Sequence, residues 1–403
     1  MGLPAWKQVE ASGYIVKDRQ NMYVVIGADI VPTKSNMGLF ISGDSESLIG
    51  EELKDVLEGA SYRIFNLEVP LTDEEIPIIK QGPNLIAPTT AVAGYKAIGV
   101  DLLTLANNHI LDQDIQGLKN TIMTLEKESI NHLGGGNNLK AASKPFIFNF
   151  ANKKIGVYAC AEHEFSIAGE TTPGANPFDP LWSLDHVEEL KEKTDYVIVL
   201  YHGGKEHYRY PSPMLQRTCR RLVDKGADLV ICQHSHCIGC EEKYAGGVII
   251  YGQGNFIFDD SDDECWQTSL LVKVDDDFNV IYLPLIKTGN GVRLAEKNDA
   301  EAILDDFLER SNQINKEGAV QKKYDEFARS CLTKYLNNMK GKETVIYKVA
   351  NRLSQNKLRE KTLKRKYDIR QLVALRNWIE CEAHRELLIK GIQSKTEKEP
   401  NRK

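Results

Sequence analysis

Short apolar runs alternate with amphipathic stretches from about Tyr23 to Ile286, and this alternation constrains the fold more than any other feature of the 403-residue chain. The runs are rich in β-branched or aromatic residues and are bounded by Gly, Asp or Asn, which is typical of buried strands. The predicted strands are Tyr23–Ile26, Tyr62–Asn66, Leu102–Leu105, Ile155–Ala159, Tyr196–Leu200, Leu229–Cys232 and Val248–Tyr251. The predicted helices between them are Leu48–Glu58, Thr89–Ile98, Gln116–Glu128, Leu184–Lys193 and Met214–Lys225. Strands and helices in alternation predict an α/β architecture.

The alternating region ends in two segments, Leu270–Val274 and Val280–Ile286, that flank three aspartates. They predict a terminal β-hairpin, which could belong to a second sheet. After about Ala295 glycine and proline become scarce, charges multiply and helical periodicity dominates. We therefore expect a helical appendage behind the α/β domain. Its segment Lys357–Lys366 is strongly basic, which is more often typical of a solvated helix face than of a membrane or polyanion contact.

These changes of pattern predict three parts: a main domain at residues 22–290, a helical extension at 295–393 and a disordered tail at 394–403. The formal net charge of −6 argues against a general nucleic-acid binder, because such proteins displace counterions with a basic surface. Residues 1–8 lack the sections of a signal peptide, and no stretch approaches about 18 uninterrupted apolar residues. We therefore expect no transmembrane segment and a cytoplasmic location.

The chain has eight cysteines, which we interpret as reduced thiols in a protein of this length without a secretory signal. Cys232, Cys237 and Cys240 cluster around two histidines, so a cysteine–zinc site is a second interpretation. It is the weaker one, because the spacing is irregular and no second CxxC pair completes a zinc motif.

Polar residues follow most of the predicted strands directly. The clusters are Gly27-Ala28-Asp29, Asn66-Leu67-Glu68, Asn107-Asn108-His109 with Asp112, His202-Gly203-Gly204, Gln233-His234-Ser235-His236 and Gly254-Asn255. In α/β sheets the carboxyl ends of the strands face the ligand crevice, so these loops supply functional groups. Imidazole and carboxylate groups are the ligands that suit Mn, Fe or Zn. Together the clusters predict a site for one or two divalent cations.

Each residue taken alone also has an ordinary structural interpretation. Asp29 can be a turn or cap residue, Glu68 can be a surface group, and Asn108 with His109 can close a turn through side-chain hydrogen bonds. His234 and His236 are harder to explain in this way. On an extended segment, two residues that lie two positions apart point to the same side and can bind one metal or two neighbouring metals.

The ordered set of motifs resembles the CapA family of capsule and poly-gamma-glutamate biosynthesis proteins. Its pieces are Asn66-Leu67-Glu68, Asn107-Asn108-His109 with Asp112, His202-Gly203-Gly204 with Glu206, Gln233-His234-Ser235-His236 and Tyr251-Gly252-Gln253-Gly254-Asn255-Phe256-Ile257-Phe258-Asp259. These proteins are similar to calcineurin-like metallophosphoesterases. The resemblance implies two packed mixed β-sheets flanked by helices and a bimetal site, over roughly residues 22–290.

The resemblance also implies a ligand set. Asp29 and His236 are expected to bind the first metal, Asn108, His202 and His234 the second, and Glu68 to bridge the two. One position departs from the wider superfamily, which usually has a histidine two residues after the first aspartate. This chain has Val31 there. One tightly bound and one loosely bound metal is therefore an alternative to a stable pair.

Further residues are assigned by the same resemblance. His109 is expected to be the general acid that protonates the leaving group, and Asp112 to orient its imidazole. Lys80 is expected to meet an anionic substrate, and Glu206 and Asn255 are expected on the substrate side of the site.

The expected function is that of a metal-dependent hydrolase in the biosynthesis of capsule polysaccharide or poly-gamma-glutamate. It would cleave a phosphoester or an amide bond with metal-activated water, and its substrate would be an anionic small molecule or polymer. The alternative is a non-catalytic accessory protein of a capsule assembly complex, whose C-terminal helices dock capsule-biosynthesis proteins. A cysteine–zinc interaction module is the third and weakest possibility.

Overall fold

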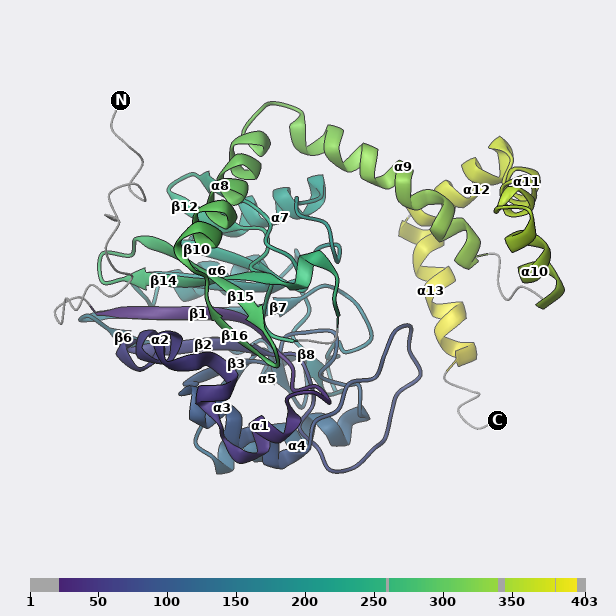
Figure 1. The fold of residues 1–403 in the computed structure, drawn as a ribbon. Helices are drawn as coiled ribbons and strands as arrows, with labels where there is room; N and C mark the ends of the chain where they lie inside the picture. Colours follow the sequence, from purple (N-terminus) through teal and green to yellow (C-terminus); the bar gives the residue numbers. More distant parts are fainter. Residues whose placement is uncertain (1–21, 259–260, 340–344, 381, 397–403) are drawn as a thin grey trace. The chain divides into compact units, whose positions relative to one another are not determined.

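A computed structural model describes residues 22–258, 261–339, 345–380 and 382–396 (Figure 1). The described residues up to Val320 form one compact unit, and those from Gln321 onward form a second. The prediction about residues 1–8 lies outside the described residues.

The first sheet carries the N-terminal strands of the chain. Four parallel strands follow one another in it: β1 (Tyr23–Ile30), β2 (Tyr62–Leu67), β3 (Leu102–Thr104) and β4 (Asn131–Leu133). On the other side of β1 lie the antiparallel strands β14 (Thr268–Asp275), β15 (Val280–Thr288) and β16 (Gly291–Leu294). The short strand β13 (Asn255–Ile257) pairs in parallel with the end of β1. The predicted hairpin is thus confirmed as β14–β15, but it extends the sheet of β1 instead of entering a second sheet.

The second sheet is parallel at its centre and antiparallel at its two edges. In order across the sheet its strands are β11 (Glu241–Tyr244), β12 (Gly247–Ile250), β10 (Leu229–Gln233), β9 (Tyr196–His202), β7 (Lys153–Ala161) and β6 (Phe146–Phe150). A small ribbon, β5 (Gly135–Gly136) with β8 (Gly174–Ala175), stands apart from both sheets. All seven strands predicted from the apolar runs are present, distributed over the two sheets.

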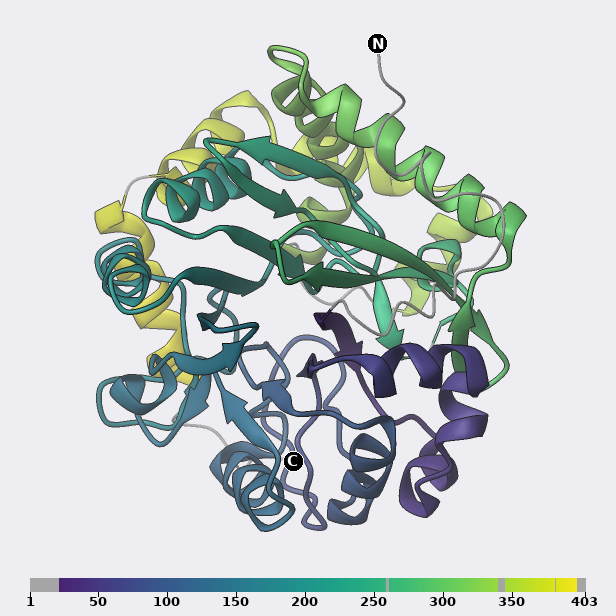
Figure 2. The same cartoon turned by 90° about the vertical axis from the view of Figure 1, so that its left-hand side faces the viewer.

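Helices cover the outer faces of the sheets (Figures 1 and 2). Beside the first sheet lie α1 (Met37–Ser42), α2 (Ser45–Gly59), the 3₁₀ turn η2 (Thr89–Ala91), α3 (Val92–Ile98) and α4 (Asp114–Lys127). Beside the second sheet lie α6 (Ser183–Lys191) and α7 (Pro213–Asp224), and two short elements, α5 (Leu139–Ala142) and η3 (Glu264–Trp266), occur in connections. The five predicted helices correspond to α2, η2 with α3, α4, α6 and α7. Local signals set their starts, as in α7, where Ser212 accepts a hydrogen bond from the Leu215 amide and Pro213 begins the helix.

Alternate residues of each strand point to opposite faces of its sheet. The apolar residues on one face of each sheet pack against the other sheet, and those on the opposite face pack against helices. Ile26 of β1 and Leu200 of β9 belong to one buried cluster between the sheets. Val25, the neighbour of Ile26, points the other way and packs with Leu53 of α2. The predicted α/β architecture of two packed mixed sheets flanked by helices is confirmed, and it has the layers that the resemblance to calcineurin-like metallophosphoesterases implies.

The helical region after the sheets begins with α8 (Lys297–Ile314), which belongs to the first unit. Its Phe307 is fully buried with Ile238 and Leu270, and the Arg310 guanidinium donates a hydrogen bond to the Gly239 carbonyl at 2.8 Å. The compact units divide near residue 320, because α8 buries an apolar face against the β-rich domain. The division into three parts stays a prediction.

The second unit is helical in its described part, as predicted for the extension. Its elements are α9 (Ala319–Met339), α10 (Val345–Leu353), α11 (Lys357–Lys366), α12 (Ile369–Glu380) and α13 (Glu382–Thr396). Of the predicted disordered tail, residues 394–396 lie in α13, and residues 397–403 lie outside the described part. Among the described helices, none combines the length and apolar character that crossing a bilayer requires.

Gly27 provides a test of how tightly the sheet beside the polar cluster is packed. A Cβ atom at this position would lie 2.1 Å from Cε1 of Phe65, a fully buried ring. We expect Gly27→Ala to destabilise the protein by about 1–3 kcal/mol, because the core must shift to admit the methyl group. Gly38→Ala is the control, since nothing lies within 4 Å of its added Cβ. Urea unfolding of both variants checks this, and equal midpoints would contradict the packing described here.

Candidate metal centre

Four strands from the two sheets bring polar side chains to one place, at their carboxyl ends. Asp29 lies near the end of β1, Glu68 directly follows β2, and His202 is the last residue of β9. His234 and His236 follow β10. All five are buried, with residue exposures between 0% and 8%. The predicted convergence of these side chains is therefore present in the structure.

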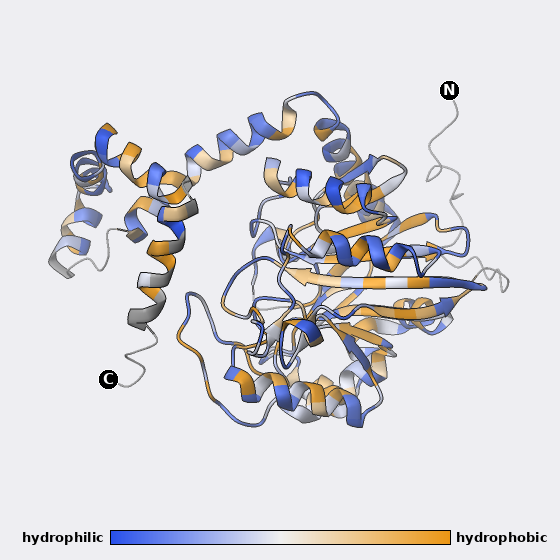
Figure 3. Cartoon of the chain, turned by 180° about the vertical axis from the view of Figure 1, so that it is seen from behind, coloured by the Kyte–Doolittle hydropathy of each residue, from blue (hydrophilic) through white to orange (hydrophobic). Residues whose placement is uncertain are grey.

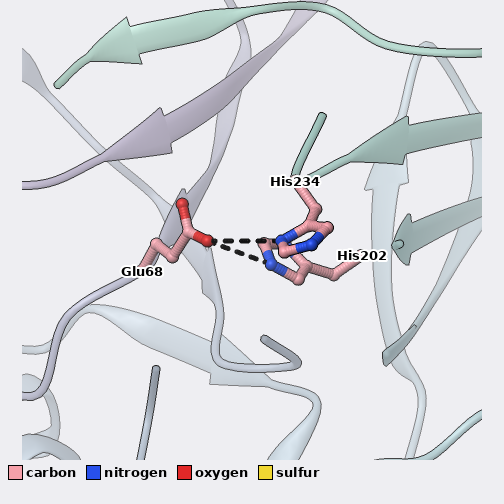
Figure 4. A group of neighbouring side chains, drawn as sticks. All are labelled: Glu68, His202 and His234. Atoms are coloured by element: carbon pink, nitrogen blue, oxygen red, sulfur yellow. Dashed lines mark ion pairs between the residues drawn. The ribbon is translucent and has the colours of Figure 1, made fainter. Parts of the chain in front are cut away.

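Glu68, His202 and His234 form the first of two ligand-like groups (Figure 4). Oε1 of Glu68 lies 3.0 Å from Nε2 of His202 and 3.9 Å from Nδ1 of His234. Oδ1 of Asn108 lies 3.0 Å from the same Nε2 of His202. The structure thus brings together the four residues that the resemblance assigned to the second metal and its bridge.

Asp29, Glu68 and His236 form the other group. Oδ2 of Asp29 lies 3.7 Å from Nδ1 of His236. In each group the potential ligand atoms lie within 4.8 Å of one another, and Glu68 belongs to both. This is the placement expected of a carboxylate between two metal sites, and the ligand roles themselves stay predictions.

Several buried atoms in these groups lack hydrogen bonds. They are Oδ2 of Asp29, both carboxylate oxygens of Glu68 and Nδ1 of His234. Burying a carboxylate without hydrogen bonds or a paired charge is expensive. A divalent cation would supply the missing charge, and its preference for carboxylate and imidazole ligands matches this donor set. The residues present therefore fit a metal centre, whereas no group of potential ligands found among the described residues includes a cysteine.

Burial and the neighbouring charges shift the pKa values of the carboxylates and imidazoles in the cluster. Burial and the neighbouring Glu68 carboxylate raise the pKa of Asp29 well above its usual range. Burial acts to raise the pKa of Glu68 as well, but contacts with His202 and His234 hold it well below its usual range. Burial lowers the pKa of His202 to about 4. Burial also opposes protonation of His234, yet proximity to Glu68 prevails and raises its pKa to about 9. Without a metal, a proton on His234 therefore partly compensates the Glu68 charge.

His234 and His236 have left-handed backbone conformations, with φ values of 83° and 53°. The sequence interpretation assumed an extended segment, and the structure corrects it: the chain turns at both residues. Left-handed backbone at a residue other than glycine costs on the order of 1–3 kcal/mol and is concentrated at functional sites. The turns direct two imidazoles, whose ring centroids are 5.9 Å apart, into the cluster.

Three asparagines orient the candidate ligands. Nδ2 of Asn66 donates to Oδ1 of Asp29 at 2.7 Å, and Nδ2 of Asn107 donates to Oδ1 of Asn66 at 3.1 Å. Oδ1 of Asn255 lies 2.8 Å from Nδ1 of His236, and an amide oxygen can only accept this hydrogen bond. Asn255 was predicted on the substrate side, but the structure places its buried side chain behind a candidate ligand. The sequence motifs contain Asn66 and Asn107 without indicating these roles.

His109, Asp112 and Lys80 form a second network beside the first. Oδ2 of Asp112 lies 2.6 Å from Nδ1 of His109, as the prediction that Asp112 orients the imidazole requires. The Lys80 ammonium is paired with the other carboxylate oxygen of Asp112, and only 2% of its side chain is exposed. Lys80 was predicted to meet an anionic substrate, and the structure instead places its charge on Asp112.

The connection from β2 to η2 is held to the same aspartate. The Leu85 amide donates to Oδ2 of Asp112 at 2.6 Å, and the Ile78 amide donates to the Asp112 carbonyl at 3.1 Å. Lys80 lies on this connection between the two. Asp112 thus fixes both an imidazole and a long loop.

Glu164 and Glu206 carry negative charge at the margin of the cluster. Oε2 of Glu164 accepts a hydrogen bond from the Asn108 side chain at 3.0 Å. Glu206 has a half-exposed side chain that pairs with Lys205 at 3.3 Å, and its expected contact with substrate stays a prediction.

Val31 is 2% exposed, and its amide donates to the Ile257 carbonyl at 2.7 Å, so this position belongs to the apolar core.

Comparison with known proteins gives one family match. Residues 25–260 match the family described as bacterial capsule synthesis protein PGA_cap. Similar curated proteins include the PGA biosynthesis protein CapA of Bacillus subtilis, 30% identical over 52% of this chain and 57% of that one, and the capsule biosynthesis protein CapA of Bacillus anthracis, 28% identical over 50% and 52%. A probable polyglutamine synthesis accessory protein of Mycobacterium tuberculosis is 26% identical over 52% and 59%. The chain spans little more than half the length of these relatives.

The raised pKa of His234 predicts a pH dependence for the metal-free protein. Unfolding returns this imidazole to an ordinary pKa near 6.5, so the folded state holds the proton more tightly. The resulting stability is complete below pH 6.5 and is lost as the pH rises to about 9, by about 3 kcal/mol at most. Urea unfolding of chelator-treated protein across this range measures the loss. His234→Gln should remove it, and an unchanged slope in that variant would contradict the assignment.

Proposed function

The chain belongs to the bacterial capsule synthesis protein family PGA_cap, and from this membership we propose that it is a metal-dependent hydrolase of the CapA type. It would act in the biosynthesis of capsule polysaccharide or poly-gamma-glutamate. The observation that carries the proposal is the pair of buried ligand groups that share the carboxylate of Glu68, whose oxygens accept no hydrogen bond in the described structure. An apolar core gains nothing from such a group, whereas metal-assisted hydrolysis requires it.

The proposed ligands follow the two groups. Asp29, Glu68 and His236 would hold one divalent cation, and Glu68, Asn108, His202 and His234 a second. Mn, Fe and Zn suit this mixture of carboxylate and imidazole, and bound there they lower the pKa of water and polarise the bond to be cleaved. Because Val31 contributes no ligand, the first position has fewer protein donors than the second. We expect it to bind its metal more weakly.

His109 is proposed as the residue that protonates the leaving group. Its Nδ1 faces Asp112, which leaves Nε2 as the nitrogen that can exchange a proton with a substrate. His109 directly follows Asn108, whose side chain contacts His202, so the imidazole is held beside the candidate ligands. Asp112 and Lys80 are positioning residues, because they hold the imidazole without reaching the substrate. This division between metal ligands and a proton donor suits cleavage of a phosphoester or an amide.

The accessory role is the second candidate. A relative from Mycobacterium tuberculosis is named a probable polyglutamine synthesis accessory protein, and this name favours a supporting part in polymer synthesis. The buried pair of His109 and Asp112 favours catalysis, since a scaffold needs no oriented proton donor. An anionic substrate, capsule-biosynthesis partners and a cytoplasmic location all stay predictions for this chain.

Metal content is the first test of the proposed function. We expect near-stoichiometric transition metal in the purified protein after incubation with Mn, Fe or Zn, and its loss in the double variant His234→Ala, His236→Ala, because each substitution removes one imidazole from a ligand group. Plasma mass spectrometry after buffer exchange measures it. His384→Ala, which removes an exposed imidazole from α13, is the control. Equal metal in all three proteins, or none in any, would contradict the proposal.

Substitution of His109 separates catalysis from scaffolding. We expect His109→Ala to lower kcat by roughly 10²–10⁴-fold on whichever phosphoester or gamma-glutamyl substrate the parent cleaves, because general acid catalysis is lost. Its metal content should match the parent, since His109 belongs to neither ligand group. Unchanged turnover with intact metal would exclude His109 as the acid. Unchanged polymer synthesis in cells that carry the variant would instead support the accessory role.

A further inference from the structure

The two units of the chain have opposite charge. Residues 1–320 contain 29 Lys and Arg against 47 Asp and Glu, a formal net charge of −18. Residues 321–403 contain 22 Lys and Arg against 10 Asp and Glu, a net charge of +12. The modest overall value of −6 therefore conceals a strongly basic helical unit. Such asymmetry between parts of one chain is typical of proteins that bind an anionic surface or polymer.

The positive charge is dense and accessible in the described helices. Six of the ten residues of α11 are Lys or Arg, and Glu360 is its only acidic residue. Lys357, Lys361 and Lys364 are exposed on this helix. A run of this kind can be a solvated helix face, so charge alone does not identify a binding surface.

Large apolar side chains are also exposed on the same unit. Of the 26 large hydrophobic residues that are exposed in the described part of the chain, 13 lie in residues 321–403, which make up about a fifth of its length. The exposed fractions reach 81% at Leu353, 75% at Ile369 and 73% at Leu387, and Trp378 is 51% exposed. Figure 3 shows hydrophobic residues recurring between hydrophilic ones along these helices. Apolar surface of this extent indicates a binding partner.

Exposed apolar side chains lie close together along both α12 and α13. Ile369 and Val373 are one helical turn apart on α12, and both are at least 60% exposed. On α13, Leu387, Leu388 and Ile392 are between 47% and 73% exposed. Basic residues accompany them, with Arg370 and Arg376 on α12 and Arg385 on α13. Lys or Arg together with Leu, Ile and Trp are the residue types of helices that lie in the interface of a bilayer.

The combination of the two properties selects among possible partners. A second copy of the unit would bury apolar surface, but it would bring two charges of +12 together. A soluble polyanion would neutralise the charge and leave the apolar side chains in water. An anionic lipid surface neutralises the charge and buries the apolar side chains at once.

We propose that the helices α11, α12 and α13 of the C-terminal unit form a peripheral binding surface for bilayers that contain anionic phospholipids. Contact is made by the basic α11 together with the exposed apolar side chains of α12 and α13. This surface uses none of the candidate metal ligands. It therefore stands or falls independently of the proposed hydrolase function.

Vesicle sedimentation of the full chain tests this surface. We expect the protein to pellet with phosphatidylcholine vesicles that contain about one third phosphatidylglycerol, to remain in solution with phosphatidylcholine alone, and to be released by high salt. The triple variant Lys357→Glu, Lys361→Glu, Lys364→Glu should lower the partition coefficient by about a hundredfold or more, because each reversed lysine lies near the lipid surface. Equal pelleting with both vesicle types, or none with either, would overturn the proposal.

A double variant separates a bilayer from a soluble polyanion. Leu387→Ser with Leu388→Ser removes apolar surface without changing charge and should weaken vesicle binding about tenfold. If this variant binds anionic vesicles as well as the parent does, and soluble polyglutamate displaces both equally, the partner is a polyanion and the membrane proposal is wrong.

Matched controls come from exposed positions of the first unit. Lys119→Glu, Lys140→Glu, Lys316→Glu makes the same change in net charge, and Met123→Ser with Leu181→Ser removes comparable exposed apolar surface. Both controls should bind as the parent does, and equal weakening by control and test variants would overturn the assignment to residues 321–403. Helicity by circular dichroism and metal content should stay unchanged in all four variants, which shows that a loss of binding is not a loss of folding.

Discussion

The arrangement of the site depends on one buried carboxylate. Glu68 is fully buried at the meeting point of two sheets, and neither of its oxygens makes a hydrogen bond within the described structure. A charge in this position is tolerated only where opposite charge lies close by. His234 supplies part of that compensation, because it takes up a proton when no metal is present, whereas the nearby imidazole of His202, 3.0 Å away, has a lowered pKa and adds no charge near neutral pH. The buried carboxylate that needs a cation is thus also the residue shared by both groups of ligands that can hold one.

The rest of the fold supplies the stability that offsets the unfavourable features of this site. The two sheets bury a continuous apolar cluster between them, and helices bury each outer face. The stability of that sandwich offsets the left-handed backbone at His234 and His236 and the repulsion between Asp29 and Glu68. Register then fixes the geometry, because Asp29 is paired with Asn66 on one side and with Asn255 on the other. The residues that orient the candidate ligands are therefore neighbours in the sheet.

Most of the architecture could be predicted because its signals are local. The period of apolar residues identified the strands and helices, and the rule that parallel strands end at one edge placed Asp29 and Glu68 together. His202 lies on the other sheet, so its approach to them depends on how the two sheets pack. Pairings between distant segments could not be predicted in this way. Strand β14 lies beside β1 although more than 200 residues separate them. Helix α8 belongs to the first unit because its Phe307 is buried in an apolar cluster there. Helical periodicity continues across that boundary and does not mark it.

The contacts of some predicted site residues could not be predicted for a similar reason. The sequence identified Lys80 as a cation near the site, but its partner depends on the path of an irregular loop. Asn255 stands behind His236 because β13 pairs with β1, which no local pattern indicates. The backbone at His234 and His236 departs from the extended form because tertiary contacts override local preference there.

The double attachment of Asp112 has a consequence for the conformational equilibrium of the chain. The loop that contains Lys80 and Leu85 is docked on this carboxylate, and the same carboxylate holds the imidazole of His109. Undocking the loop removes two of the three groups that contact the Asp112 carboxylate, so the imidazole loses its orientation in the same event. If His109 is the proton donor proposed above, the fraction of molecules competent to donate a proton is the fraction with the loop docked, and a ligand that prefers the docked form would raise turnover by population shift without touching His109.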